Sequence, residues 1–152
     1  MRQKKFGVWD KVNKCWLTGA EALEIYWVDD ELQLHIGIKY ANLPFFNETA
    51  EKFEIVEYTG LKDCKRTKEY PEGQEIYEGD IVKHNGKNYQ EPMLVKFIDG
   101  GFCIGKDDIG RGIDEFGDYV TIRDAMAQAR FQNTTLQLEI IGNIFENKNL
   151  LK

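Results

Sequence analysis

The carboxylates around residue 78 come nearest to a catalytic pattern. Glu75, Glu78 and Asp80 lie close together in the sequence, and His84 follows them. General acid–base catalysis needs two such groups that converge on one substrate with separated pKa values. The spacing shows no such convergence, and it suits a turn before a strand, because Gly79 tolerates a positive φ and Asp80 can accept backbone N–H bonds. An enzyme that uses Glu78, Asp80 or His84 is therefore the last of three hypotheses.

The histidines and cysteines form no recognisable metal or nucleophile pattern. The chain has two histidines, at positions 35 and 84, and three cysteines, at positions 15, 64 and 103. A zinc site needs three or four clustered ligands, and the acidic glycine-rich segment 105–118 matches neither a phosphate-binding loop nor an EF-hand loop. We therefore predict no catalytic residue, no metal and no cofactor. Scattered cysteines without CxxC spacing are typical of reduced thiols in a cytoplasm.

A short basic stretch is the candidate for nucleic-acid contact. Tyr58 and Tyr70 flank it and would allow stacking on a base. The whole chain carries a formal net charge of −6, which disfavours the broad positive surface that phosphate backbones attract. Nucleic-acid binding is therefore the second hypothesis. Its cations are Lys62, Lys65, Arg66 and Lys68.

The elements that must position these residues are mostly short strands. Residues 32–40 alternate apolar and polar side chains, which predicts a half-buried strand. The steps Asn85-Gly86 and Asp99-Gly100-Gly101 predict hairpin turns. Residues 121–130 have apolar side chains at helical spacing. This helical face either packs on its own sheet or forms a subunit interface, and it consists of Ile122, Ala125, Met126 and Ala129.

These elements predict an α+β, β-rich fold with antiparallel sheets and one or two short helices. At 152 residues the chain can bury a core without a disulfide. No stretch approaches the ~20 apolar residues of a membrane span, so we expect no membrane partner. The expected parts are a β-rich segment with a short helix (1–60), a polar linker or turn (61–75), a small SH3-like barrel-type segment that includes the helix 121–130 (76–147), and a tail (148–152).

Three motifs stand in order along the chain. They are Phe6-Gly7-Val8-Trp9-Asp10, then Tyr58 to Asp63 with Glu75 to Val82, then Glu139 to Asn147. Together they resemble the signatures of the YopX-like family of bacteriophage and prophage proteins. Residues 64–73 form an insertion relative to that pattern, and Gly7 and Val8 depart from its opening. We expect a structural role for the motif residues Trp9, Asp10, Tyr58, Thr59, Gly60, Leu61, Asp63, Gly79, Asp80, Gly142 and Asn143.

The resemblance implies a small phage or prophage protein in the cytoplasm of a bacterial host, with self-assembly as a property to test. It transfers no activity, cofactor or functional residue, because a fold alone does not fix a function. The leading hypothesis is a non-enzymatic accessory protein. It would bind a second copy of itself, or a phage or host protein.

Overall fold

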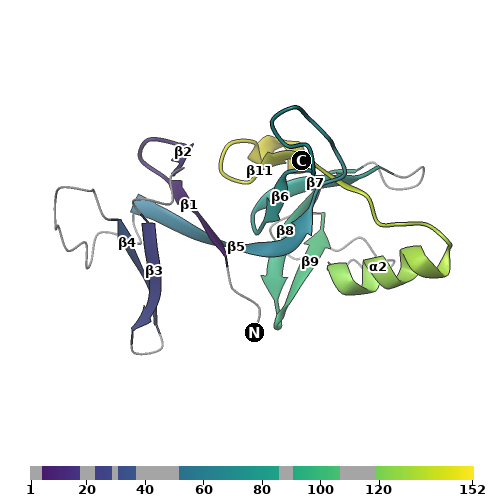
Figure 1. The fold of residues 1–152 in the computed structure, drawn as a ribbon, viewed down its shortest axis with the longest axis horizontal. Coiled ribbons are helices and arrows are strands. Elements are labelled where there is room, and N and C mark those ends of the chain that lie inside the picture. Colours follow the sequence, from purple (N-terminus) through teal and green to yellow (C-terminus); the bar gives the residue numbers. More distant parts are fainter. Residues whose placement is uncertain (1–4, 18–22, 29–30, 37–51, 86–90, 107–118) are drawn as a thin grey trace. The chain divides into compact units, whose positions relative to one another are not determined.

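The chain divides into two compact units, residues 1–57 and 58–152. The computed structural model, drawn in Figure 1, describes residues 5–17, 23–28, 31–36, 52–85, 91–106 and 119–152. The boundary between the units falls inside strand β5 (Phe53–Lys62). Each unit is therefore built from its own part of that strand together with its own neighbours.

The first unit consists of antiparallel strand pairs. Its strands are β1 (Phe6–Asp10), β2 (Cys15–Trp16), β3 (Leu23–Val28), β4 (Glu31–Ile36) and the first half of β5. Strand β1 pairs with β2 and with β5, and β3 pairs with β4. Val8, Trp9 and Val56 are buried, and the rings of Trp9 and Trp16 meet edge to face with centroids 5.2 Å apart. The short helix expected in this segment would run from Thr18 through Leu23. Residues 18–22 lie outside the described residues, and Leu23 belongs to strand β3 instead.

The second unit is built on a five-stranded antiparallel sheet in the order β10-β9-β8-β7-β11, which curls into a half-barrel. A tight turn joins β8 to β9, and both Asp99 (φ 48°) and Gly100 (φ 83°) take positive φ there. Such a turn matches the twist of the flanking strands. The bounds of the unit's further elements are β6 (Glu75–Tyr77), β7 (Asp80–His84), β8 (Met93–Ile98), β9 (Gly101–Gly105), β10 (Val120–Thr121), α2 (Ile122–Phe131), β11 (Leu138–Asn143) and the 3₁₀-helix η1 (Lys148–Leu151).

Helix α2 packs its apolar face on the core of its own unit. Thr121 caps the helix by accepting a hydrogen bond from the Asp124 N–H at 3.0 Å, so the helix starts one residue later than the spacing predicts. Ile122 belongs to the core cluster, and Ala125 and Met126 pack against it. Ala129 is also buried. The four residues that the sequence offered as a subunit interface thus face the interior. The buried members of the cluster are Ile76, Val82, Met93, Val95, Ile104, Ile122 and Leu138.

The expected β-rich α+β class with antiparallel sheets and a short helix is confirmed. The SH3-like character of the curled sheet stays a prediction. The segment 61–75 differs from the expected linker, because its ends lie in β5 and β6 and it belongs to the second unit. The expected tail contains η1 at residues 148–151.

Truncation of a core side chain should distinguish the interior from the surface of the second unit. Ile104→Ala should lower the free energy of unfolding by about 2–5 kcal/mol, because Ile104 is fully buried in the cluster and leaves a cavity. Phe131→Ala is the control, since Phe131 is 91% exposed and its truncation should cost less than about 0.5 kcal/mol. Urea unfolding measures both. Equal losses would contradict this assignment of the core.

Candidate functional site

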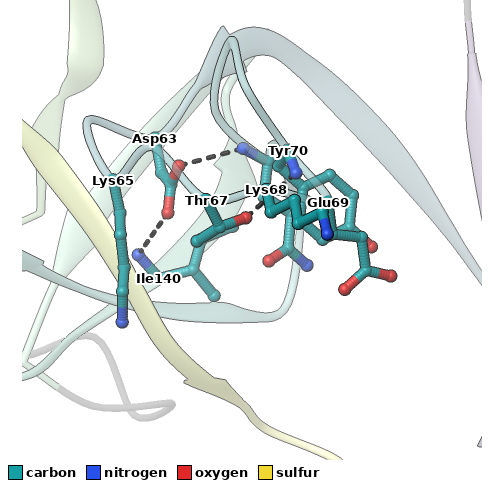
Figure 2. A pocket seen from close by; sticks show the side chains of 8 residues that line it. Asp63, Lys65, Thr67, Lys68, Glu69, Tyr70 and Ile140 are labelled. Carbon is teal, nitrogen blue, oxygen red and sulfur yellow. Dashed lines mark hydrogen bonds between the residues drawn. The ribbon is translucent and has the colours of Figure 1, made fainter.

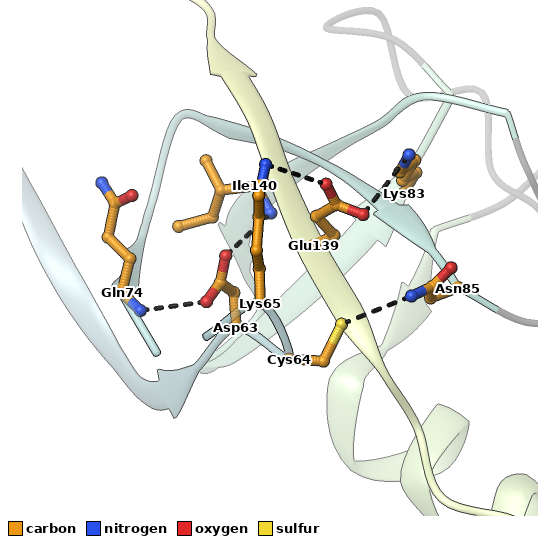
Figure 3. A network of polar contacts seen from close by, with 8 residues as sticks. All are labelled: Asp63, Cys64, Lys65, Gln74, Lys83, Asn85, Glu139 and Ile140. Carbon is orange, nitrogen blue, oxygen red and sulfur yellow. Dashed lines mark hydrogen bonds and ion pairs between the residues drawn. The ribbon is translucent and has the colours of Figure 1, made fainter. Parts of the chain in front are cut away.

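The loop between β5 and β6 is held closed by the buried carboxylate of Asp63. The Asp63 N–H donates to the Gln74 carbonyl oxygen at 2.8 Å, and the Gln74 N–H donates back to Asp63 Oδ1 at 2.9 Å. The Ile140 N–H of β11 approaches Asp63 Oδ2 at 3.5 Å. Figure 3 shows these contacts, and the Cys64 N–H adds a bond to the Leu138 carbonyl at 2.7 Å. One side chain therefore joins both ends of the loop to a distant strand.

Backbone conformation at Gly73 completes this closure. Gly73 has a φ of +92°, and a Cβ there would collide with the Asp63 carbonyl oxygen and the Arg66 guanidinium. Arg66 Nη1 donates to that same carbonyl at 2.8 Å. The Tyr70 carbonyl accepts from the N–H groups of Thr67 and Gly73, both at 3.1 Å. The loop is thus braced internally as well as at its ends.

The braced loop encloses a pocket with a volume of about 410 Å³. Figure 2 shows its side chains, which come from the loop and from β11. Two ammonium groups and two carboxylates line it, so its charges balance and it has no strong preference for an anion. The lining residues are Asp63, Lys65, Thr67, Lys68, Glu69, Tyr70, Gln74 and Ile140.

Two of the four cations in the basic stretch of this loop, Lys62 and Lys65, have acidic partners. Lys62 Nζ lies 2.9 Å from Glu72 Oε2, and this hydrogen bond and charge raise the pKa of Lys62. The same contact lowers the pKa of Glu72. Lys65 Nζ lies 3.5 Å from Glu139 Oε1. The structure therefore does not gather the predicted nucleic-acid contacts into an unopposed positive patch.

The Glu-Gly-Asp step forms the turn before β7. Asp80 is buried, and its Oδ2 accepts the Tyr77 N–H at 2.8 Å. Gly79 between them has a φ of 87°. Burial raises the pKa of Asp80 from 3.8 to about 7, and the negative charge of Asp63 contributes to the rise, while the Tyr77 N–H opposes it. A carboxylate that titrates near neutrality thus sits beneath a tight turn.

The three residues of the enzyme hypothesis do not point to one place. Glu78 Oε1 accepts the Phe97 N–H at 3.2 Å. Asp80 and His84 stand at opposite ends of β7. Glu75, the fourth group of that stretch, accepts a hydrogen bond from the Tyr77 hydroxyl at 2.9 Å. All three carboxylates of this stretch therefore bind the protein's own donors at neighbouring turns and strands.

The motif residue Asp10 also organises a turn, in the first unit. Asp10 Oδ1 accepts the N–H groups of Val12 and Asn13, both at 2.9 Å. Oδ2 accepts the Asn13 side-chain amide at 2.7 Å. The hydrogen bonds from Asn13 lower the pKa of Asp10. Trp9 before it is buried against Trp16.

The motif residues before the loop form a second set of local contacts. Thr59 Oγ1 donates to the Ile76 carbonyl at 2.7 Å and accepts the Leu61 N–H at 3.1 Å. Gly60 between them has a φ of 88°, and Leu61 packs against the core cluster. The Tyr58 ring lies against that of Tyr77, with centroids 5.5 Å apart.

The closing motif forms the turn after β11. Asn143 Oδ1 accepts the N–H groups of Phe145 at 3.0 Å and Glu146 at 2.9 Å. A Cβ on Gly142 would collide with the Asn147 side chain. Among the described residues, every buried polar side chain belongs to the predicted motif set and bonds to backbone. These residues are Asp10, Thr59, Asp63, Asp80 and Asn143.

Sequence reasoning missed an exposed aromatic side chain, Phe97, on the β8–β9 hairpin. Met93 and Val95 of β8 are 2% and 0% exposed, whereas Phe97 on the same face is 44% exposed. Its ring meets that of Phe102 edge to face, with centroids 5.1 Å apart. The face of the sheet that is buried at Met93 and Val95 therefore extends to a position, Phe97, where it is exposed to solvent. Their spacing of two residues puts Met93, Val95 and Phe97 on one face of β8. Leu94 on the other face is buried as well, so the sequence gives no sign of which of these side chains stays exposed.

The described part of the chain has neither a cluster of metal-binding side chains nor a membrane-spanning helix. No group of three or more His, Cys, Asp or Glu residues there has the geometry to hold a metal ion. No helix within it is long and apolar enough to cross a membrane.

Comparison with known proteins gives one family and several structural relatives. A family model described as YopX protein matches residues 5–152. Protein yopX from Bacillus subtilis has a similar structure, with a TM-score of 0.60, 19% identity and 97% of each chain covered. Protein EF1440 from Enterococcus faecalis has a TM-score of 0.51, 22% identity and 99% of each chain covered. At these identities the two structures show a shared fold alone. No curated protein matches the chain.

A methyl group at position 73 should open the loop. Gly73→Ala should lower the free energy of unfolding by about 2–4 kcal/mol, because left-handed strain adds to a collision with Asp63 and Arg66. Gly100→Ala is the matched control: its φ is +83°, but a Cβ there meets nothing within 4 Å. Its free energy of unfolding should fall only by the cost of the left-handed strain, about 1–2 kcal/mol. Urea unfolding that gives the same loss for both variants would contradict the close packing at Gly73.

Titration of Asp80 should make stability fall as the pH rises. Its pKa is raised on folding, from 3.8 to about 7. The contribution of protonated Asp80 to the free energy of unfolding is therefore fully present below pH 3.8. It is lost as the pH rises through about 7. The loss is on the order of 4 kcal/mol. Asp80→Asn keeps an oxygen for the Tyr77 N–H but removes the charge, so the difference in unfolding free energy between variant and wild type should grow in its favour from pH 4 to pH 8. If the unfolding free energies of the variant and the wild type changed in parallel with pH, Asp80 would not be the source of the pH dependence.

Proposed function

The chain belongs to the YopX protein family, and from this premise we propose that it is a non-catalytic phage or prophage accessory protein that acts by binding protein. Its partner is a second copy of the chain, or a phage or host protein, in the bacterial cytoplasm. The proposal concerns the second unit, where the apolar surface and the turn-forming polar residues described above lie.

The observation that carries the proposal is the exposed ring of Phe97, which meets the half-buried ring of Phe102. Phe97 continues the buried row of Met93 and Val95 into solvent, with 44% of its surface exposed. Aromatic side chains at a rigid position lose little conformational entropy on binding and dominate the energy of protein interfaces. The Asp99-Gly100 turn holds the hairpin that presents the pair. The pair therefore has the chemistry and the rigidity of a binding anchor.

The state of the polar residues supports a non-catalytic role. A catalytic carboxylate needs access to its substrate. Asp63 and Asp80 instead accept backbone N–H groups in the interior. The motif residues that carry chemical groups are thus used to fix turns, which leaves the surface as the place where function is expected.

Nucleic-acid binding is the alternative. It would use the pocket of the loop, where Lys68 lines the wall and Tyr70 is 40% exposed. An exposed aromatic ring next to a cation suits stacking on a base. The contacts of Lys62 and Lys65 with Glu72 and Glu139 reduce the local positive charge, so this alternative ranks second.

Native mass spectrometry of the tagged protein, purified gently from host cells with and without nuclease, tests the proposal. We expect an oligomer or a bound protein that survives nuclease. Phe97→Ser should weaken that complex at least tenfold, because it removes a central aromatic anchor. Phe131→Ser is the matched control, since it removes an exposed phenylalanine (91%) that does not continue the core face.

The outcomes separate the hypotheses. A partner lost with nuclease treatment supports the nucleic-acid alternative and makes Lys68 the first target. A monomer without any bound species, in both the untreated and the treated samples, refutes the proposal. Circular dichroism of Phe97→Ser checks that its fold is intact.

A further inference from the structure

We propose that the outer edge of β9, between Asp99 and the start of α2, binds an extended basic segment of a partner protein. This inference rests on the proposed function and adds the mode of binding and the chemistry of the partner. The segment would add a strand to the sheet beside the exposed Phe97 and the half-buried Phe102.

The first argument is that β9 is paired unequally on its two sides. Strand β8 pairs with all of β9, from Gly105 to Gly101. Strand β10 pairs only with Ile104 and Cys103, and the chain then turns into α2 at Ile122. Within the part of the chain that the structure describes, no strand lies beside the outer edge of Gly101 and Phe102. Figure 1 shows α2 starting beside β9 and running away from the hairpin.

The direction of the backbone groups follows from the bonds on the other edge. The Val95 carbonyl accepts from Gly79 and the Phe97 N–H donates to Glu78, so both residues direct these groups away from β9. Their cross-strand partners, Ile104 and Phe102, must then direct their own N–H and C=O groups away from β8. At Ile104 these groups meet β10, whereas at Phe102 they face the open edge. An added strand would find a donor and an acceptor there.

The two edges of the hairpin are therefore different. On the β8 edge the Glu78 carboxylate accepts the Phe97 N–H at 3.2 Å, so a side chain takes the place of a strand. Charged side chains of this kind protect exposed edges from unwanted pairing. Within the described residues, no side chain caps the β9 edge at Phe102 in this way. The asymmetry selects β9 as the edge for a partner.

Charge defines the chemistry of that partner. Asp99 lies at the turn at one end of the open edge, and Asp124 lies at the other end, in the first turn of α2. Burial raises the pKa of Cys103, and both carboxylates raise it further, so each acts on the residue next to Phe102. Among the described residues, neither carboxylate has an ion-pair partner within 4.0 Å, and Arg123 is the exposed cation adjacent to Asp124 in the chain. A partner segment that contains lysine or arginine would be complementary in charge to the carboxylates at both ends of the β9 edge.

A second copy of this chain fits the edge poorly. Two β9 edges paired about a two-fold axis would bring the carboxylates of one copy toward those of the other. Like charges brought together at an interface disfavour that pairing, and the whole chain is acidic, with a net charge of −6. The proposal is therefore specific to a different, basic partner. Its apolar side chains would contact Phe97 and Phe102, and its cations would face Asp99 and Asp124.

The test uses fluorescein-labelled peptides that alternate valine with lysine, and a second set that alternates valine with glutamate. Fluorescence anisotropy at low salt should show at least tenfold tighter binding of the lysine peptide, and the affinity should fall as salt is added. The double variant Asp99→Asn with Asp124→Asn should weaken binding by about five- to tenfold, from two partly exposed charge contacts. Asparagine tolerates the φ of 48° at position 99.

Two further readings make the test specific to the edge. Glu72→Gln is the control, because it removes one exposed charge in the loop between β5 and β6, at a residue that does not line the pocket, and should leave the affinity unchanged. Hydrogen exchange of the Phe102 amide should slow when the lysine peptide is bound, because that N–H would then donate to the added strand. Equal affinity for the two peptide sets, or unchanged exchange at Phe102 on binding, overturns the proposal.

Failure of this inference can be separated from failure of the proposed function. A cellular protein partner that is lost with Phe97→Ser but kept by the double aspartate variant supports protein binding and refutes the basic edge. Binding of the lysine peptide with protection of Phe102, in a protein that purifies without any protein partner or oligomer, supports the edge and refutes the proposed function.

Discussion

The buried carboxylate of Asp63 is the interaction on which the organisation of the second unit depends. A charge in the interior is costly unless it is paired or hydrogen bonded. Asp63 meets this demand with backbone N–H groups from Gln74, at the far end of its loop, and from Ile140 in β11. The close approach at Gly73 and the contact between Lys65 and Glu139 follow from that closure. The same negative charge contributes to the raised pKa of Asp80.

Polar and aromatic side chains have opposite locations in this protein from those expected of a catalytic site. The buried polar side chains of the described residues bond to turns, while an aromatic side chain, Phe97, lies 44% exposed at the end of a buried row. Carboxylates that bind backbone give rigidity, because each N–H they accept would otherwise be unsatisfied in the interior. Exposed aromatic surface gives binding energy. Because the carboxylates serve the turns and the exposed side chain is aromatic, we propose binding and not catalysis.

The β8–β9 hairpin shows how one element can be protected on one side and open on the other. Glu78 belongs to the same turn as Asp80, so the turn that starts β7 also supplies the cap on the β8 edge. Among the described residues, the β9 edge is paired only as far as β10 extends, and β10 is two residues long. The start of α2 therefore limits the sheet, and it places Asp124 where the sheet ends.

The sequence by itself determined the features that depend on near neighbours. The hairpin turn at Asp99-Gly100, the helix close to residues 121–130 and the membership of the family could all be predicted, because turns, helices and motifs are set by residues a few positions apart. Only the tertiary structure decided that Asp63 contacts Ile140, 77 residues away, and that Glu139 opposes Lys65. It also decided the exposure of Phe97. That exposure depends on how far the covering elements reach across the sheet, and the alternation of a strand gives the face of a side chain but not its cover.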